Sequence, residues 1–404
     1  MLKDKKLIFV NISAFLLLFL VHVLDNIVKE GQISIPYIGI IKNVFLICII
    51  FFYFIEFLQN LTFCKNSIFV REFNIVLYWA IGMLILSVAM ALNAHQYTMQ
   101  SFVSIFRLIL PAIIAFLVLN ILDFTQIYWI MVVILIVGSV GFIFAMGVEN
   151  FTPAMLARIS FFNSYSPIES HFFSPLSLSL CIFFLYYRRY RIFTFWSLGF
   201  VFLTFKRFMI LFTCMVAIGS LFISLNRKID LKWKTYFKIM MIILIFLYFI
   251  ILTGRSHIFS MDFVNNLTMG RSEMFNALRY SDFKSYGLES SQIFLQRDIE
   301  MDLIKIYSEL SILGVLLTIN QLCNLCSKKL YSFLLVLLLF VEMLTSHFYD
   351  IVYFWIIFYI TLGCVNYERG ENIARFKIKQ IFRFKFNKRN WRITNKWKVK
   401  LWKD

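Results

Sequence analysis

The chain has 404 residues, of which 61% are hydrophobic and only 15% are charged, and its formal net charge is +18. A soluble protein of this length needs far more polar surface, so the composition excludes a water-soluble enzyme or binding domain. It predicts a helical membrane protein whose few charged residues are confined to short segments.

Apolar runs of the length that a helix needs to cross a bilayer recur along the whole chain. The first run, at residues 7–24, is too long for the core of a signal peptide and has no small-residue cleavage site after it, so we interpret it as a span. The pattern predicts an all-α, polytopic transmembrane helical bundle with about twelve spans, at residues 7–24, 37–58, 73–92, 103–122, 127–147, 172–187, 192–205, 208–225, 235–253, 306–322, 330–346 and 348–366.

Basic residues favour alternate loops of this bundle. Lys and Arg are frequent at 60–72, 186–191, 226–234 and 323–329, whereas the loops after the first, third and eleventh spans nearly lack them. Because Lys and Arg are retained on the cytoplasmic side, both termini are predicted to be cytoplasmic. The tail at 368–404 adds thirteen Lys or Arg against three acids, interleaved with tryptophans, which suits a lipid-surface anchor and argues against nucleic acid as a partner.

This topology leaves three polar elements on the outer side, namely residues 148–169, the Lys206-Arg207 pair and a long loop at 254–305. The long loop contains seven acids and six bases, although bases are disfavoured on that side. We therefore expect one integral membrane domain at 1–367, with its chemistry in a large extracytoplasmic loop of mixed helix and coil at 254–305. The remaining residues, 368–404, form a basic cytoplasmic tail.

Several bases on the outer side suit an anion site. The Lys206-Arg207 pair is either the turn between two short helices or a pair of charges inside one long helix, which costs about 2.5–3.5 kcal/mol for each charge. Snorkelling to lipid head groups, or solvation on the loop surface, is the alternative for all of these bases. Guanidinium groups bind phosphate oxygens in bidentate geometry, so converging arginines predict a diphosphate site. The candidates are Lys206, Arg207, Arg107, Arg271 and Arg279, with Arg255 in the same loop.

His171, at the start of the predicted sixth span, is either structural or part of the same site. The alternating acids Asp298, Glu300 and Asp302 lack the neighbouring histidines of a transition-metal site, so a general base is preferred to a metal ligand, with a solvated loop face as the alternative. The sequence contains no HExxH, GxxxxGK[ST] or GxGxxG motif, and its lone CxxC is a weak zinc signal. We expect no metal and no cofactor.

The order of the motifs in the second half of the chain resembles that of a known family. Four motifs carry the resemblance, namely Lys206-Arg207 between two spans, Gly270-Arg271 in the long loop, Tyr286-Gly287-Leu288-Glu289 after it, and the stretch 302–314 with Glu309 and Gly314. In these motifs and in its whole architecture the chain is similar to the O-antigen polymerase (Wzy) family, within the O-antigen polymerase and ligase superfamily.

The resemblance implies a glycosyltransferase of the bacterial inner membrane that joins undecaprenyl-diphosphate-linked repeat units at its outer face, without nucleotide sugars. By position, Arg207 and Arg271 match the family's diphosphate-holding bases, and Glu289 belongs to a matching stretch. Ligases carry a His-Asn pair as the base where Glu300-Met301 stands here, which leaves Glu300, or one of the two neighbouring aspartates, as the candidate base. Membrane lipid, a flippase and a chain-length regulator are the further partners implied.

Two other functions are open alternatives. One is an O-antigen ligase or another lipid-phosphate-dependent glycosyltransferase, against which the missing histidine counts. The other is a flippase or transporter of lipid-linked oligosaccharides, which is expected to show two-fold repeats and ionisable residues at the bilayer midplane. Here the two halves do not mirror each other, and the charge collects in one outer loop. The polymerase reading is favoured, with Arg207, Arg271 and Glu300 as catalytic residues and with Lys206, Arg107, Arg279, Glu289 and His171 as substrate-binding residues.

Overall fold

The computed structural model describes residues 2–31, 34–59, 67–159, 166, 168–204, 206–230, 232–253, 264, 265, 268, 270–349 and 351–367. Every named element in these ranges is a helix, as the all-α class predicts. The basic tail at 368–404 and the part of the long loop that contains Arg255 lie outside the described residues.

The helices are α1 (Leu2–Lys29), α2 (Ile38–Gln59), α3 (Val70–Ala94), α4 (Met99–Ile121), α5 (Phe124–Met146), η1 (Val148–Phe151), α6 (Pro153–Leu156), α7 (Ser174–Tyr186), α8 (Arg191–Thr204), α9 (Arg207–Phe222), α10 (Lys232–Leu252), α12 (Arg271–Tyr280), α13 (Ser290–Leu295), α14 (Asp302–Leu325), α15 (Leu330–Thr345) and α16 (Val352–Asn366).

Each predicted span coincides with one of these helices, but the helices differ in length. Six are long and apolar enough to cross a membrane, namely α1 from Leu7 onward, α2, α3, α4, α5 and α10. Five other apolar helices have 13 to 16 residues, and a straight helix of that length rises at most about 24 Å, less than a typical hydrocarbon core. Helix α14 is longer, but its first turns carry Asp302, Lys305 and Glu309. The helices agree with a multi-pass membrane protein, and the number of twelve spans stays a prediction.

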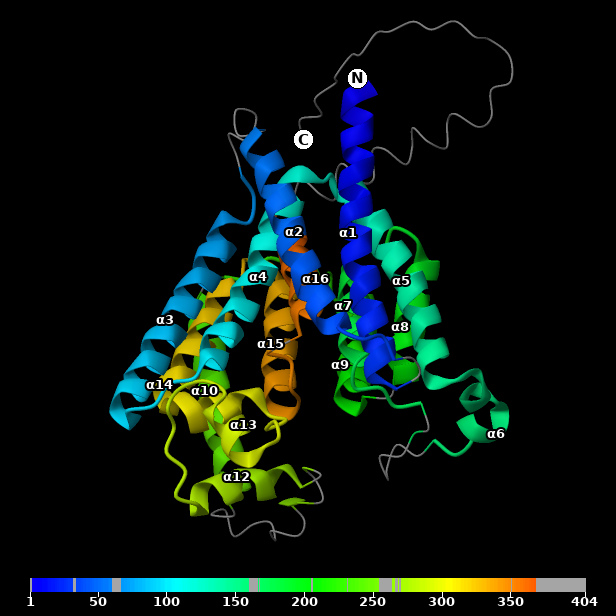
Figure 1. Ribbon diagram of the computed structural model, residues 1–404. Helices are drawn as coiled ribbons and strands as arrows, with labels where there is room; N and C mark the ends of the chain where they lie inside the picture. Colours follow the sequence, from blue (N-terminus) through cyan, green and yellow to red (C-terminus); the bar gives the residue numbers. More distant parts are fainter. Residues whose placement is uncertain are drawn as a thin grey trace, which may run out of the picture.

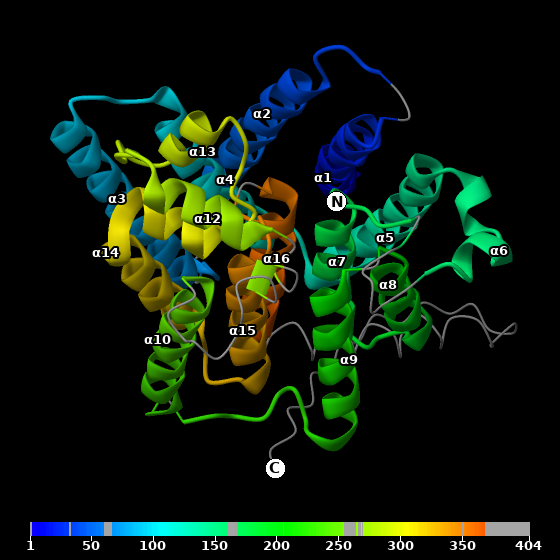
Figure 2. The same ribbon diagram turned by 90° about the horizontal axis from the view of Figure 1, so that it is seen from below.

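Helix α16 forms the centre of the bundle. Residues 353–365 of this helix are all buried, and α16 packs against α4 and α7. Around it, α4 contacts α3 and α2, α1 contacts α5, and α14 contacts α3 and α15 (Figure 2). The rings of Trp79 and Trp355 pack edge-on with centroids 6.0 Å apart and join α3 to this centre. Large aromatic side chains therefore fill the middle of a bundle that has few small residues.

The outer faces of several helices expose large apolar side chains. Phe51 on α2 is 63% exposed, and Leu221 and Phe222 on α9 are 76% and 83% exposed. Similar rows occur on α3 and α10. Contiguous apolar surface of this extent is unfavourable in water and suits lipid chains, which agrees with the membrane reading of the composition.

The segments that connect the helices lie at two opposite ends of the bundle, and contacts join them at each end. At one end, Arg71 at the start of α3 donates to the carbonyl of Cys326, 2.9 Å away, between α14 and α15. At the other end, Ser170 donates to Glu30 at 2.5 Å and joins the segment before α7 to the end of α1. This second end, which we call the loop end, carries α6, α12 and α13 at the bottom of Figure 1. The loops predicted to be inner and outer thus separate to opposite ends.

Candidate functional site

A cavity of about 560 Å³ lies at the loop end of the bundle, and it brings together segments far apart in the sequence. Its walls come from α1, α2 and α4, from the starts of α7, α9 and α12, from the segment before α14, and from the connection between α15 and α16. Predicted site residues that line it are Arg107, His171, Lys206, Arg271 and Glu300, together with the alternative base Asp298.

The cavity has an excess of positive charge. Five bases line it, namely Lys29, Lys42, Arg107, Lys206 and Arg271. Three acids line it as well, which leaves two net positive charges when the histidines are counted as neutral. A cavity with low-dielectric walls concentrates the field of such charges, so this arrangement favours an anionic ligand.

Arg271 and Glu300 form an ion pair across the cavity wall. Gly270, with φ 78°, ends the preceding turn, and Arg271 is the first residue of α12. Its Nε donates to Oε2 of Glu300 at 3.0 Å, and its Nη2 lies 2.9 Å from the same oxygen as an ion pair. Burial alone would raise the pKa of Glu300, but the hydrogen bond and the charge of Arg271 bring it below the ordinary value of a glutamate. Glu300 is therefore ionised at neutral pH and is a weak proton acceptor.

Lys206 joins the starts of α7 and α9. Because α8 ends at Thr204 and α9 begins at Arg207, the basic pair lies at a break between two helices, not inside one long helix. Lys206 Nζ donates to Nδ1 of His171 at 2.9 Å and lies 3.5 Å from a carboxylate oxygen of Glu169. Burial lowers the pKa of Lys206 and the charge of Arg271 adds to this effect, whereas Glu169 opposes both.

Helices α1 and α2 add charged residues that the sequence analysis did not select. Asp25 accepts hydrogen bonds from Lys42 at 2.5 Å and pairs with Lys29 at 3.0 Å. Both lysines line the cavity, as do Asp25 and His22. Lys42 falls inside the predicted span 37–58, and a charge inside a span is itself a functional signal. That signal was available in the sequence.

His347 is a further residue that the sequence did not point to. It lies in the connection between α15 and α16, lines the cavity, and donates from Nδ1 to Asp302 at 2.7 Å. Asp302 itself is buried and also accepts the backbone N–H groups of Phe348 and Tyr349 at 2.7 and 2.8 Å. The residues are 45 positions apart, so only the folded chain reveals the pair. Asp302 thus holds this connection and does not line the cavity.

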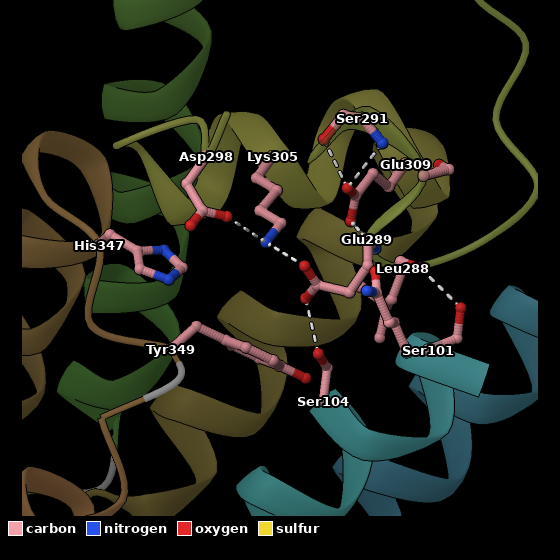
Figure 3. Close-up of polar contacts among 12 residues, drawn as sticks. Ser101, Ser104, Leu288, Glu289, Ser291, Asp298, Lys305, Glu309, His347 and Tyr349 are labelled. Atoms are coloured by element: carbon pink, nitrogen blue, oxygen red, sulfur yellow. Dashed lines mark hydrogen bonds and ion pairs between the residues drawn. The ribbon is translucent and has the colours of Figure 1, made fainter. Parts of the chain in front are cut away.

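Glu289 lies in a buried network behind the cavity (Figure 3). Its carboxylate accepts from Lys305 at 2.7 Å and from Ser104 at 2.6 Å, and only about 5% of each charged side chain is exposed. Burial would raise the pKa of Glu289, but Lys305 holds it below the ordinary value. Lys305 also lies 3.5 Å from Asp298. Glu289 does not line the cavity, so a role in substrate binding stays a prediction for this residue.

The remaining predicted residues lie elsewhere at the same end. Arg207 adjoins Lys206 at the start of α9 and is half-buried, but it is not among the residues that line the cavity. Arg279 lies at the far end of α12 and lines a different cavity of about 880 Å³, together with Phe249, Phe275 and Tyr307. Neither placement tests the roles predicted for these two arginines.

Within the described ranges, no group of three or more His, Cys, Asp or Glu side chains is arranged to hold a metal ion. Both cysteines of the CxxC sequence, Cys323 and Cys326, are buried and unbridged. The cavity thus offers lysine and arginine side chains to an anion, and histidine and carboxylate side chains to a proton. Comparisons with protein-family models, with curated proteins and with solved structures gave no match for this chain.

Proposed function

We propose that this chain is a surface-polysaccharide polymerase that joins undecaprenyl-diphosphate-linked repeat units at the outer face of the bacterial inner membrane. The observation that carries the proposal is the cavity at the loop end, where five residues predicted from separate segments meet in a net positive environment. The apolar faces around the bundle supply a lipid surface for the undecaprenyl chain.

The proposed chemistry follows from the charges that line the cavity. A diphosphate is already a good leaving group, and the bond from the sugar to it breaks more readily when fixed cations stabilise the charge that develops. Arg271, Lys206 and Arg107 are the residues that we assign to this role, because guanidinium and ammonium groups form charge-assisted hydrogen bonds to phosphate oxygens. The acceptor is a hydroxyl of a second lipid-linked repeat unit, which attacks the anomeric carbon.

The test uses the full-length protein in liposomes, together with the lipid-linked repeat units that accumulate in cells from which the gene is deleted. We expect a ladder of polymer lengths without any nucleotide sugar, and the same ladder in EDTA because the proposed charge stabilisation uses lysine and arginine. Repeat units that stay single, or that only cross the bilayer, would contradict the proposal, and crossing would favour a flippase. Loss of the ladder in EDTA would contradict the metal-free part.

A further inference from the structure

The two residues that follow His347 in the chain are held by hydrogen bonds to two different helices. Asp302 accepts the N–H groups of these two residues, at 2.7 and 2.8 Å. Trp355 on α16 donates from Nε1 to the carbonyls of Phe348 and Tyr349, at 3.0 and 3.2 Å. The connection between α15 and α16 is therefore fixed by an aspartate from α14 and a tryptophan from α16.

The hydrogen bond to Asp302 determines what the imidazole can do. Because a carboxylate oxygen accepts from Nδ1, the neutral ring carries its proton on Nδ1 and its lone pair on Nε2. An imidazole oriented in this way by a buried carboxylate is the arrangement that serves as a general base in many enzymes, because the carboxylate also stabilises the imidazolium that forms. His347 has this arrangement in a cavity that also contains Arg271 and Lys206.

We propose that His347 is the general base that removes the proton from the acceptor hydroxyl, and that Asp302 is the residue that positions it. The inference rests on the proposed polymerase function and names a group that the sequence analysis did not consider. In this step the acceptor oxygen bonds to the anomeric carbon, and the hydroxyl proton moves to Nε2 of His347. The bond from the anomeric carbon to the diphosphate oxygen breaks, and the lipid diphosphate leaves with the electron pair.

Glu300, the base favoured by the sequence, is less suited to this role. Its carboxylate is bound to Arg271, and that contact keeps its pKa below the ordinary value, so it is a weaker proton acceptor. Imidazole accepts a proton readily near neutral pH. Asp302 pairs with His347 at 2.7 Å and Glu289 interacts with it electrostatically, and Figure 3 shows the ring of His347 pointing toward Asp298 and Lys305.

The test compares rates in the liposome assay. General-base catalysis contributes about 10²–10⁴-fold, so we expect His347→Gln to lower kcat by that factor with little change in KM. His347→Ala is expected to regain part of the rate when free imidazole is added. His95→Gln is the matched control, because His95 lies at the end of α3 and outside this cavity.

Asp302 is tested through its dependence on His347. Asp302→Asn should lower kcat, and the double variant Asp302→Asn/His347→Gln should be no slower than His347→Gln alone, because the aspartate acts through the histidine. A merely structural aspartate would make the double variant slower. If Asp302→Asn fails to fold, the two His347 variants still decide whether the histidine is the base.

The possible outcomes separate the inference from the function on which it rests. A wild-type protein that makes no polymer would remove the proposed function. A polymerising wild type whose His347 variants keep its kcat would overturn the inference alone, and a large loss in Glu300→Gln would then reassign the base. A raised KM with unchanged kcat in His347→Gln, or no recovery of His347→Ala with imidazole, would also overturn the base assignment.

Discussion

The Arg271 guanidinium donates one N–H to an oxygen of Glu300 at 3.0 Å, and its Nη2 lies 2.9 Å from the same oxygen. A guanidinium has five such donors, so this pair fixes the direction of the side chain and leaves further donors for an anion in the cavity. Only 18% of the arginine side chain is exposed, and its neighbour Lys206 adds a second cation. At the scale of single residues, the acids of the cavity therefore orient its bases.

The sharpest prediction at this scale concerns Arg271. We expect Arg271→Ala to lower the polymerisation rate by about 10²–10³-fold, the usual effect of removing one donor to a developing negative charge. Arg271→Lys should recover only part of the rate, because an ammonium cannot bind phosphate in bidentate geometry. The measurement is the initial rate and the length distribution of polymer in liposomes.

Arg158→Ala serves as the control for these variants, because Arg158 is an exposed base at the same end of the bundle that does not line the cavity. Arg207→Ala is measured alongside, since the motif order also predicts that it abolishes long chains. Full-length polymer from Arg271→Ala at the wild-type rate would show that Arg271 is a surface charge without a role in the reaction.

At the scale of elements, the segment before α13 is held inside the bundle by a set of backbone and side-chain bonds. Ser101 of α4 donates to the carbonyl of Leu288 at 2.6 Å, and the N–H of Leu288 donates to Ser87 of α3 at 3.1 Å. Glu309 of α14 accepts from the N–H groups of Glu289 and Ser291, at 2.9 and 3.1 Å. Residues of three helices, α3, α4 and α14, thus fix the segment that leads into α13.

Gly287 permits this close approach. Its φ is +112°, and a Cβ added there would overlap Ser87 Oγ. Gly287→Ala should therefore destabilise the folded protein by the backbone strain plus about 1–3 kcal/mol of overpacking, and it should slow polymerisation by releasing the loop. Thermal unfolding in detergent, together with the polymerisation assay, measures both effects.

Gly270 provides a matched control for Gly287. It also has a positive φ, +78°, but a Cβ there would meet nothing within 4 Å. Gly270→Ala should cost only the backbone strain, about 1–2 kcal/mol. Equal loss of stability in the two variants would mean that the contact with Ser87 contributes nothing.

The sequence predicted helix positions well, because each apolar run follows directly from the hydropathy of neighbouring residues. It predicted one site from the unusual bases on an outer face, and Arg107, Lys206 and Arg271 line one cavity whereas Arg207 and Arg279 do not. It did not predict the pairing of His347 with Asp302 or the burial of Glu289, because both depend on contacts between segments that only the packed bundle brings together.

At the scale of the whole molecule, the charges and the apolar faces divide the surface. Exposed apolar side chains cover the sides of α2, α3, α9 and α10, whereas the charged cavity opens at the loop end. The segments predicted to be cytoplasmic meet at the opposite end, for example where Arg71 contacts the α14–α15 connection. A membrane that surrounds the apolar faces would therefore keep the cavity on one side only.

This division predicts the topology of the chain. Because Lys and Arg are retained in the cytoplasm, the end with Arg71 should face inward and the loop end should face outward.

Reporter fusions along the chain measure on which side of the membrane each segment lies, and the short loops at the two ends of the bundle serve as controls for one another. Lys65, Tyr165 and Lys398 lie outside the described residues, and the sequence alone predicts their sides. The expected positions are Glu30, His95, Tyr165 and Asp282 outside, and Lys65, Arg189, Lys232 and Lys398 inside. A cytoplasmic reporter at Asp282 would put the cavity on the wrong side for lipid-linked repeat units that are joined outside, and it would end the proposed mechanism.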